Sequence, residues 1–421
     1  MNLSSGVITK VNIWILNHYA TPPDAAGYTR HFDFAVELVK RGHQVRIFSS
    51  SFSHRTGQQR LAENNIYGTE RVAGVEFVWV KTFAYEKNNW RRVANMLSYA
   101  VRVVPAGLVT SGSPDVILAS SPHLFAGLSG YILSKIKKAK FILEIRDLWP
   151  QTFIDIGGYS NTSPLVRILK VMENFLYRKA SKIISLLPRA FVYMNKLGIK
   201  KQKIICIPNG VDAQFFENNE ASLPEDLHKL ISKLKASGKI LVGHIGSCGI
   251  ANSVYTIIGA ARLLQEKGYE KIHFLLVGDG PLKNEIIKTA KKLGLKNISF
   301  YQSIPKKEVT EILKAIDIGV TASPKSNLYR FGVSINKIFD YMICAKPIVS
   351  ALDSPNDAVT ESGCGITVPP ESSEEMAKAM IRIYNMSENQ RHEMGTKGYE
   401  YVNKYHSFPT LTDNLLEAIR D

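Results

Sequence analysis

The first half of the chain alternates short apolar runs with stretches in which apolar residues recur at helical spacing. Residues 11–17 form one such run, and residues 28–41 after it carry a single apolar stripe. Strands separated by helical segments predict βαβ units and a parallel sheet. The further strand candidates in this half are residues 44–49, 75–80, 115–119, 141–145 and 182–187.

The second half repeats the same order of elements. Its strand candidates are residues 239–245, 272–277, 298–301, 318–321 and 347–350, and its helix candidates are residues 254–267, 282–293 and 308–315. Residues 207–212 are rich in turn formers and are expected to be the linker. We therefore predict an α/β protein with two Rossmann-like, doubly wound domains, residues 1–206 and 207–398, which face a central cleft. Ligands bind such sheets beyond the carboxyl ends of the strands.

Charge separates the two halves. Of the 53 Lys and Arg residues, 28 precede residue 211, against 12 acidic residues there, whereas the rest of the chain has 25 of each. The basic half favours an anionic partner. A nucleic acid is not expected, although the sequence pI is 9.5, because half of the chain is neutral and no recognition motif is present.

The compartment follows from three features. The four cysteines are widely spaced and are expected to be reduced. Residues 1–11 lack the apolar core of a signal peptide. The longest uncharged window, residues 116–134, contains Ser120-Ser121-Pro122-His123, so we interpret it as a strand, a turn and a helix start. We expect a cytoplasmic protein without a membrane span.

Residues 87–109 form a basic amphipathic segment. Apolar residues beginning with Trp90 and Val93 recur at helical spacing, and polar and basic residues such as Arg91 and Arg102 lie between them. Such a helix lies at a membrane interface or packs on a sheet, and the sequence leaves both open. A second basic cluster spans residues 135–140, so an anionic inner-membrane surface is an expected partner.

Two glycine loops follow strands of the second half, at Gly246-Ser247 and at Gly278. Glycine there lets a phosphate approach backbone N–H groups at a helix start. Each loop is also compatible with a plain turn. The spacing is not that of a dinucleotide fingerprint, so a nicotinamide enzyme is not expected.

Residues 329–342, with residues 345–350 after them, carry the most specific pattern: YRFGVSINKIFDYM and AKPIVS. Here the chain resembles the retaining glycosyltransferases of the GT-B fold, glycosyltransferase family 4. Within that family it is similar to the cell-surface polysaccharide transferases related to the O-antigen N-acetyl-L-fucosamine transferase. The resemblance covers most of the chain and includes residues 24–28, 144–150 and 207–212.

The resemblance implies transfer of a sugar from a UDP-sugar to a lipid-diphosphate-linked saccharide, with the anomeric configuration kept, in O-antigen or capsule biosynthesis. N-acetyl-L-fucosamine or a related N-acetylamino sugar is the expected donor group. A sugar-nucleotide epimerase of the same fold is the alternative. No Asp-x-Asp pair is present, so neither a metal nor another cofactor is expected. The resemblance also implies that residues 399–421 form a helix that returns to the first domain.

Three departures from the family pattern concern the donor site. Asp340 matches the acid that binds the ribose, but Gly332 stands where the family has its first acid. Ser247 and Asn252 stand where the family places an Arg and a Lys on the diphosphate.

Because a leaving diphosphate needs positive charge, we expect Arg330 and Lys337 to replace the missing pair. Lys337 precedes Asp340 by three residues, so both project from one helix face. Phe331, Val333 and Ser334 lie in the turn before this helix and are expected to set donor choice, together with the Gly27 loop. Ile304 matches the position that meets the base.

Three residues of the first half are candidates for the acceptor side. His123 follows a strand and either handles a proton or caps a helix. Arg146 and Asp147 follow the strand at residues 141–145, and Asp147 is the candidate for orienting or deprotonating the acceptor hydroxyl. Arg30, after the Gly27 loop, either reaches the phosphate or is solvated.

Overall fold

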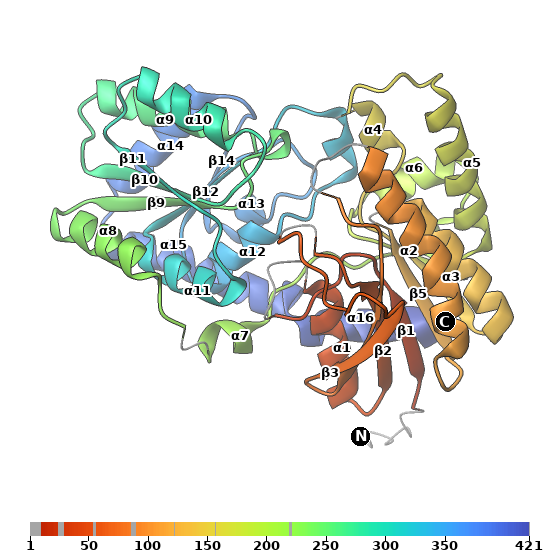
Figure 1. The fold of residues 1–421 in the computed structure, drawn as a ribbon. Coiled ribbons are helices and arrows are strands. Elements are labelled where there is room, and N and C mark those ends of the chain that lie inside the picture. The colour runs from red at the N-terminus through yellow and green to blue at the C-terminus, as the bar shows by residue number, and fades with distance from the viewer. Residues whose placement is uncertain are drawn as a thin grey trace, which may run out of the picture. The chain divides into compact units, whose positions relative to one another are not determined.

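The computed structural model describes residues 10–23, 29–53, 56–85, 90–121, 123–155, 157–218 and 221–420. The chain forms two compact units (Figure 1). The first comprises the chain up to Pro208 together with the segment from Thr412, and the second is Asn209–Leu411. The boundary between Pro208 and Asn209 falls inside the turn-rich segment at residues 207–212.

The first unit holds an eight-stranded sheet in the order β3-β4-β2-β1-β5-β6-β7-β8. Its strands pair in parallel, except that β3 runs antiparallel to β4. The predicted apolar runs became six of these strands, whereas the polar β3 and the three-residue β8 were not predicted. The bounds are β1 (Asn12–Leu16), β2 (Gln44–Ser50), β3 (Tyr67–Val72), β4 (Val75–Val80), β5 (Val116–Ser121), β6 (Lys140–Ile145), β7 (Lys182–Ser185) and β8 (Ile204–Cys206).

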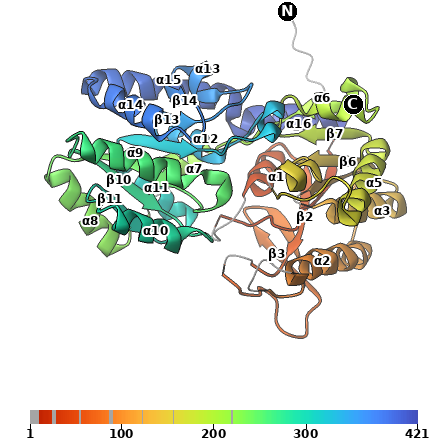
Figure 2. The same ribbon diagram turned by 90° about the horizontal axis from the view of Figure 1, so that it is seen from above.

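Helices cover this sheet. Helix α2 packs on α3, and α3 packs on α5, so these three form one layer (Figure 2). Helix α1 lies against β2 and β4. Trp14, Phe48 and Phe77 are among the large side chains that fill the core. The bounds are α1 (Arg30–Lys40), α2 (Trp90–Val109), α3 (Leu124–Lys137), α4 (Gln151–Asp155), α5 (Pro164–Lys179), α6 (Ala190–Lys196) and the 3-10 turn η1 (Lys201–Lys203).

The second unit holds a six-stranded parallel sheet in the order β11-β10-β9-β12-β13-β14. Its strand order reverses at β9, from which β10 and β12 extend to opposite sides, as in other doubly wound folds. The predicted runs became five strands, and the short β14 was not predicted. The bounds are β9 (Ile240–Ile245), β10 (Ile272–Val277), β11 (Ile298–Tyr301), β12 (Ile318–Ala322), β13 (Ile348–Ala351) and β14 (Gly365–Val368).

Two clusters of buried apolar side chains, one around Phe274 and one around Tyr341, form the core of the second unit. Helix α9 packs on α14, and α12 packs on α15. The bounds are α7 (Ala213–Glu217), α8 (Glu225–Ala236), α9 (Val254–Glu266), α10 (Lys283–Lys292), α11 (Lys306–Ala315), α12 (Asn336–Ile343), α13 (Ala358–Ser362), α14 (Ser373–Tyr384), α15 (Glu388–His406) and the 3-10 turns η2 (Ile250–Asn252) and η3 (Asn327–Phe331).

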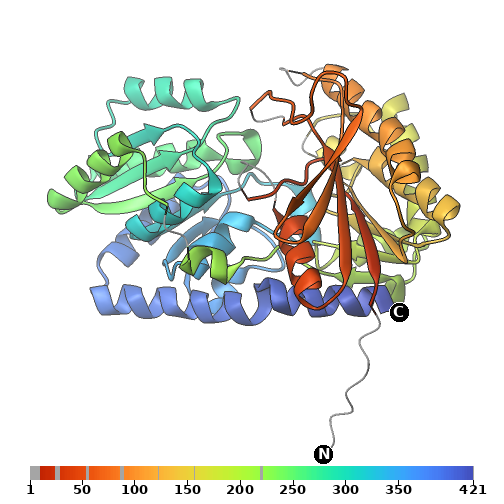
Figure 3. The same cartoon turned by 60° about the horizontal axis from the view of Figure 1, so that its bottom comes forward.

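The C-terminal segment is two helices rather than one. Helix α15 ends at His406, Ser407 is extended, and α16 (Phe408–Arg420) follows (Figure 3). From Thr412 onward the segment belongs to the first unit, where Lys140 donates a hydrogen bond of 2.8 Å to the Ile419 carbonyl. Among the described residues, every helix is too short or too polar to span a bilayer.

Candidate functional site

The two glycine loops of the second unit pack backbone against backbone. After β9, the Gly246 N–H donates to the Val277 carbonyl at 2.9 Å, and the Cys248 N–H donates to the Asp279 carbonyl at 2.9 Å. A Cβ atom at Gly278 would lie 1.9 Å from the Gly246 carbonyl oxygen, so only glycine fits there. Two turns that were predicted separately therefore form one backbone surface at the carboxyl edge of the sheet.

Asp279 fixes the loop that follows β11. Its carboxylate accepts hydrogen bonds from the Ser303 N–H at 2.8 Å and from the Lys283 ammonium at 2.7 Å. Although burial acts to raise it, these bonds lower the pKa of Asp279 to about 2. Ile304, the candidate for contact with the base, is half-buried and packs against the second unit's core.

Lys337 lies against the first of these loops. Its ammonium donates a 2.6 Å hydrogen bond to the Asn252 side chain. It would also lie 3.0 Å from a Cβ atom at Gly246, so the charge sits beside the glycine backbone. Burial lowers the pKa of Lys337 to about 8, while the Asp340 carboxylate acts to raise it. A cation from α12 therefore lies beside the loop that follows β9.

The turn before α12 is held rigidly. Gly332 has a φ of 100°, which favours glycine. The Val333 N–H and carbonyl both bond to the Asn356 side chain, at 2.9 and 2.8 Å. The Ser334 hydroxyl accepts from the Asn209 N–H at 2.7 Å. The turn therefore fixes the start of the helix that carries Lys337.

The remaining donor-side candidates differ in exposure. Asp340 is half-buried on α12, one turn after Lys337. Phe331 is buried, and the guanidinium carbon of the exposed Arg330 lies 4.6 Å from the centre of its ring. Ser247 is exposed in the loop after β9. Gly27 lies outside the described residues.

His244, on β9, was missed as a candidate. It is fully buried, and its Nδ1 atom lies 3.3 Å from the Val320 carbonyl. Burial and the charge of Lys337 keep the pKa of His244 well below its ordinary value, so the ring is neutral. Nδ1 then carries the proton and Nε2 is an acceptor, buried without a hydrogen-bond partner among the described residues. A histidine inside an apolar strand was the available signal.

In the first unit, His123 caps the N-terminus of α3. Its Nδ1 atom accepts from the Ala126 N–H at 3.3 Å, and its Nε2 atom lies 2.7 Å from Nδ1 of His18. Burial lowers the pKa of His123 to about 3, and Arg92 acts in the same direction. Both ring nitrogens of His123 are therefore engaged, one at the helix N-terminus and one with His18. His18 was not singled out from the sequence.

Arg146 and Asp147 follow β6 as predicted, with Arg146 half-buried and Asp147 exposed. Desolvation of the carboxyl group by the surrounding protein raises the pKa of Asp147, and the positive charge of the neighbouring Arg146 opposes that rise.

The expectation that Arg30 is solvated was wrong, and its contact with the phosphate stays a prediction. Arg30 is buried and donates to the Glu144 carboxylate at 3.0 Å and to the Ile207 carbonyl at 2.8 Å, with a third bond to the Pro208 carbonyl. Its guanidinium therefore ties β6 to the end of the first unit. His31 and Ser120 complete the contacts of Glu144, at 2.7 and 2.6 Å.

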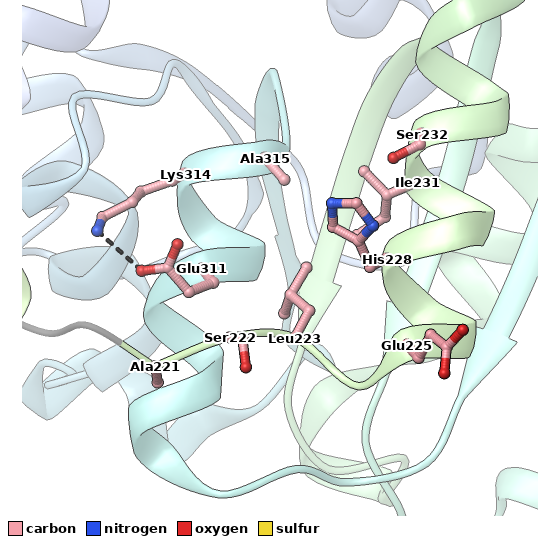
Figure 4. Close-up of a pocket in the computed structure, with 10 residues that line it drawn as sticks. All are labelled: Ala221, Ser222, Leu223, Glu225, His228, Ile231, Ser232, Glu311, Lys314 and Ala315. Carbon is pink, nitrogen blue, oxygen red and sulfur yellow. Dashed lines mark hydrogen bonds and ion pairs between the residues drawn. The ribbon is translucent and has the colours of Figure 1, made fainter.

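The described residues form no metal-binding cluster, and the groove described next lies away from the predicted site residues. No group of three His, Cys, Asp or Glu side chains is placed to hold a metal ion there. A groove of about 720 Å³ lies between α8 and α11 (Figure 4). It contains none of the predicted site residues, and its charged lining is Glu225 on α8 and the ion pair between Glu311 and Lys314 on α11.

Two family descriptions match this chain. Residues 27–210 match the glycosyl transferase 4-like domain, and residues 228–401 match the glycosyl transferases group 1. The matches show that the chain is a glycosyltransferase. Together the two matches account for most of both units, and neither describes an epimerase, so the epimerase alternative is not favoured.

Two curated relatives are similar to this glycosyltransferase. It is 21% identical over 64% of its length to a probable glycosyltransferase, WbjE, of Pseudomonas aeruginosa, and the match spans 66% of that protein. It is 23% identical over 69% of its length to a putative colanic acid biosynthesis glycosyl transferase, WcaI, of Escherichia coli, spanning 71% of that protein. The chain thus matches about two thirds of each relative.

Solved structures share the fold. The HepE protein of Anabaena in complex with UDP and glucose has a TM-score of 0.66 at 17% identity, over 98% of this chain and all of that one. Sucrose-phosphate synthase from Thermosynechococcus elongatus has a TM-score of 0.72 at 14% identity, over 98% of each chain. At these identities the likeness confirms the predicted fold of two Rossmann-like α/β domains.

Proposed function

We propose that this glycosyltransferase moves a sugar from a UDP-sugar to a lipid-diphosphate-linked saccharide at an anionic membrane surface, with the anomeric configuration kept. The observation that carries the donor side is the position of Lys337. Its ammonium is placed by Asn252 against the Gly246 backbone, beside the joined glycine loops. Backbone N–H groups together with a fixed cation form a site that suits a diphosphate.

The donor is bound in three parts. Asp340 accepts hydrogen bonds from the ribose hydroxyls, Lys337 with Arg330 neutralises the diphosphate, and residues 302–304, pinned by Asp279, meet the base. Two of the structural neighbours were solved with UDP-glucose or with UDP and glucose, which supports a uridine nucleotide.

No divalent ion is part of the proposal. A leaving diphosphate must gain positive charge as its bond to the sugar breaks. Lys337 is proposed to supply this charge, and its protonated form is available at pH 7 because its pKa is about 8.

The acceptor side is assigned to the first unit. The Asp147 carboxylate orients the incoming hydroxyl, Arg146 balances its charge, and His123 acts through His18. The departing phosphate oxygen takes the proton on the face of the sugar where the new bond forms, which keeps the configuration.

The sugar and the pathway rest on relatives and on resemblance. WcaI is described as a colanic acid biosynthesis transferase, which supports a role in cell-surface polysaccharide synthesis. We propose N-acetyl-L-fucosamine or a related N-acetylamino sugar as the group transferred, in O-antigen or capsule assembly.

The test is a panel of UDP-sugars with the purified chain, first alone and then with a polyprenyl-diphosphate-linked saccharide. The proposal predicts a lengthened lipid-linked product with one N-acetylamino sugar, with slow hydrolysis or no reaction when the donor is alone. Epimerised sugar nucleotide from donor alone would overturn it in favour of the epimerase.

A further inference from the structure

The apolar stripe of helix α2 suggests which face of the helix packs on the first unit. In the structure, α2 packs mainly with the opposite face. Its buried residues include Asn95, Met96 and Tyr99. Apart from the buried Met96 and the half-buried Val104, the stripe that begins at Trp90 is left outside, and Val101 within it is 72% exposed. The sequence left open whether this stripe packs on the sheet or lies at an interface, and the packing leaves most of it unburied.

The exposed apolar surface extends over the neighbouring helices. Helix α3 approaches α2 so closely that a Cβ atom at Gly107 would meet Leu133 at 2.5 Å, and it contacts α5 through the ring pair Tyr131 and Phe175, 5.2 Å apart. On the outer side of this layer, Ile136 of α3 is 53% exposed and Val171 of α5 is 71% exposed. Large exposed apolar side chains of this density mark an interaction surface.

The charge on the same three helices has one sign. Their sequences contain nine Lys or Arg residues, and Glu173 is their one acidic residue. Glu173 is buried, and burial raises its pKa to about 8, so it presents no negative charge to the surface. The solvent side of this layer, here called the α2–α3–α5 face, therefore combines exposed apolar side chains with cations and lacks a surface carboxylate.

We propose that the α2–α3–α5 face docks on an anionic lipid bilayer, with the exposed apolar side chains of all three helices in the interface and the cations at the headgroups. Apolar residues interleaved with Lys and Arg match the two layers of such a surface. A second copy of this chain fits less well, because a symmetric dimer would bring two sets of cations together. The inference rests on the proposed function, because an enzyme with a lipid-linked acceptor has to work at a membrane surface.

The experiment is flotation of the full chain with phosphatidylcholine vesicles, with and without phosphatidylglycerol. We expect binding that requires phosphatidylglycerol and weakens with salt. Val101→Asp and Val171→Asp should each lower it by about tenfold or more, since each places a charge in the apolar layer. Ile66→Asp is the matched control, because Ile66 is 60% exposed in the same unit but lies outside the three helices, and it should bind as wild type does.

Thermal unfolding and UDP affinity are measured on the same proteins. Unchanged values in both, with lost flotation in the face variants alone, support the docking face. Equal flotation of Val101→Asp, Val171→Asp and Ile66→Asp overturns the proposal. It is also overturned if the wild type does not bind the vesicles and instead forms a dimer that Val101→Asp dissociates. Failure of the wild type to bind UDP counts against the proposed donor and leaves the flotation result standing.

Discussion

Lys337, on α12, donates a 2.6 Å hydrogen bond to the side chain of Asn252, which lies 85 residues earlier in the loop after β9. Relatives are expected to carry a cation at the Asn252 position itself. In this chain the Asn252 amide instead accepts a hydrogen bond from a lysine of α12, so the positive charge beside the glycine loop comes from another helix.

The titration of Lys337 gives the first prediction. Because its pKa is about 8, UDP affinity should be flat from pH 7 to about 8 and fall above that, by up to about tenfold per pH unit. The UDP affinity of Lys337→Arg should not fall over this pH range, since the guanidinium group stays protonated. Calorimetric titration across this range measures it, and the same slope in both proteins would contradict the assignment.

Moving the lysine from position 337 to position 252 tests whether both positions can supply the same positive charge to UDP. Lys337→Ala should weaken UDP binding about tenfold or more, since a hydrogen bond to a charged group contributes about 1.5–3 kcal/mol. Adding Asn252→Lys to that variant should restore most of the affinity, because the cation returns at the same loop.

Lys291→Ala, on the exposed end of α10, is the control for loss of a lysine and should leave UDP affinity unchanged. A double variant no better than Lys337→Ala would show that the two positions do not share a role.

Much of this architecture could be predicted because buried parallel strands are continuous apolar runs. Residues 44–49 and 272–277 gave β2 and β10 almost to the residue. Two of the strands that were missed lack that signal: β3 reads Tyr-Gly-Thr-Glu-Arg-Val and is largely exposed, and β8 has three residues.

The site could be predicted only where its members are close in sequence. Lys337 and Asp340 share a helix face because of their spacing, and this needs no tertiary information. The close approach of Gly278 to Gly246, and the bond from Arg30 to Glu144 114 residues away, depend on which strands are neighbours. The sequence also left undecided which face of α2 packs on the first unit, because two faces of this helix are rich in apolar residues.

The buried Arg30 should be a stability determinant rather than a substrate contact. Arg30→Ala leaves Glu144 without its guanidinium and two carbonyls unpaired, so we expect about 3–5 kcal/mol lost on unfolding. Arg41→Ala, whose partner Asp413 has a side chain 71% exposed, should cost less than about 1 kcal/mol.

Urea unfolding followed by tryptophan fluorescence measures both variants. Adding Glu144→Gln to Arg30→Ala should recover part of the loss, because it removes the buried charge. Equal stability of Arg30→Ala and Arg41→Ala would contradict the structural role.

Glu173 should make the first unit less stable as pH rises. Burial raises its pKa to about 8, although the bond from the Tyr193 hydroxyl at 2.8 Å acts to lower it. Between the unfolded value of about 4.5 and pH 8 the folded state holds a proton that the unfolded chain has lost, so stability falls by up to about 1.4 kcal/mol per pH unit.

Glu173→Gln should remove this fall and unfold at a higher temperature than wild type at pH 8, with little difference at pH 5. Thermal unfolding at the two pH values tests it, with the exposed Glu393→Gln as the charge-matched control. A wild-type advantage at pH 8 would mean that Glu173 is ionised in the fold.

The most direct measurement is a calorimetric titration of UDP into the wild-type chain and into Asp340→Ala and Lys337→Ala, each in EDTA and again with Mg²⁺. The account predicts tight binding to the wild type that is equal in both buffers, and a loss of about tenfold or more in each variant. Binding to the wild type only when Mg²⁺ is present, or equal affinity in all three proteins, would contradict it.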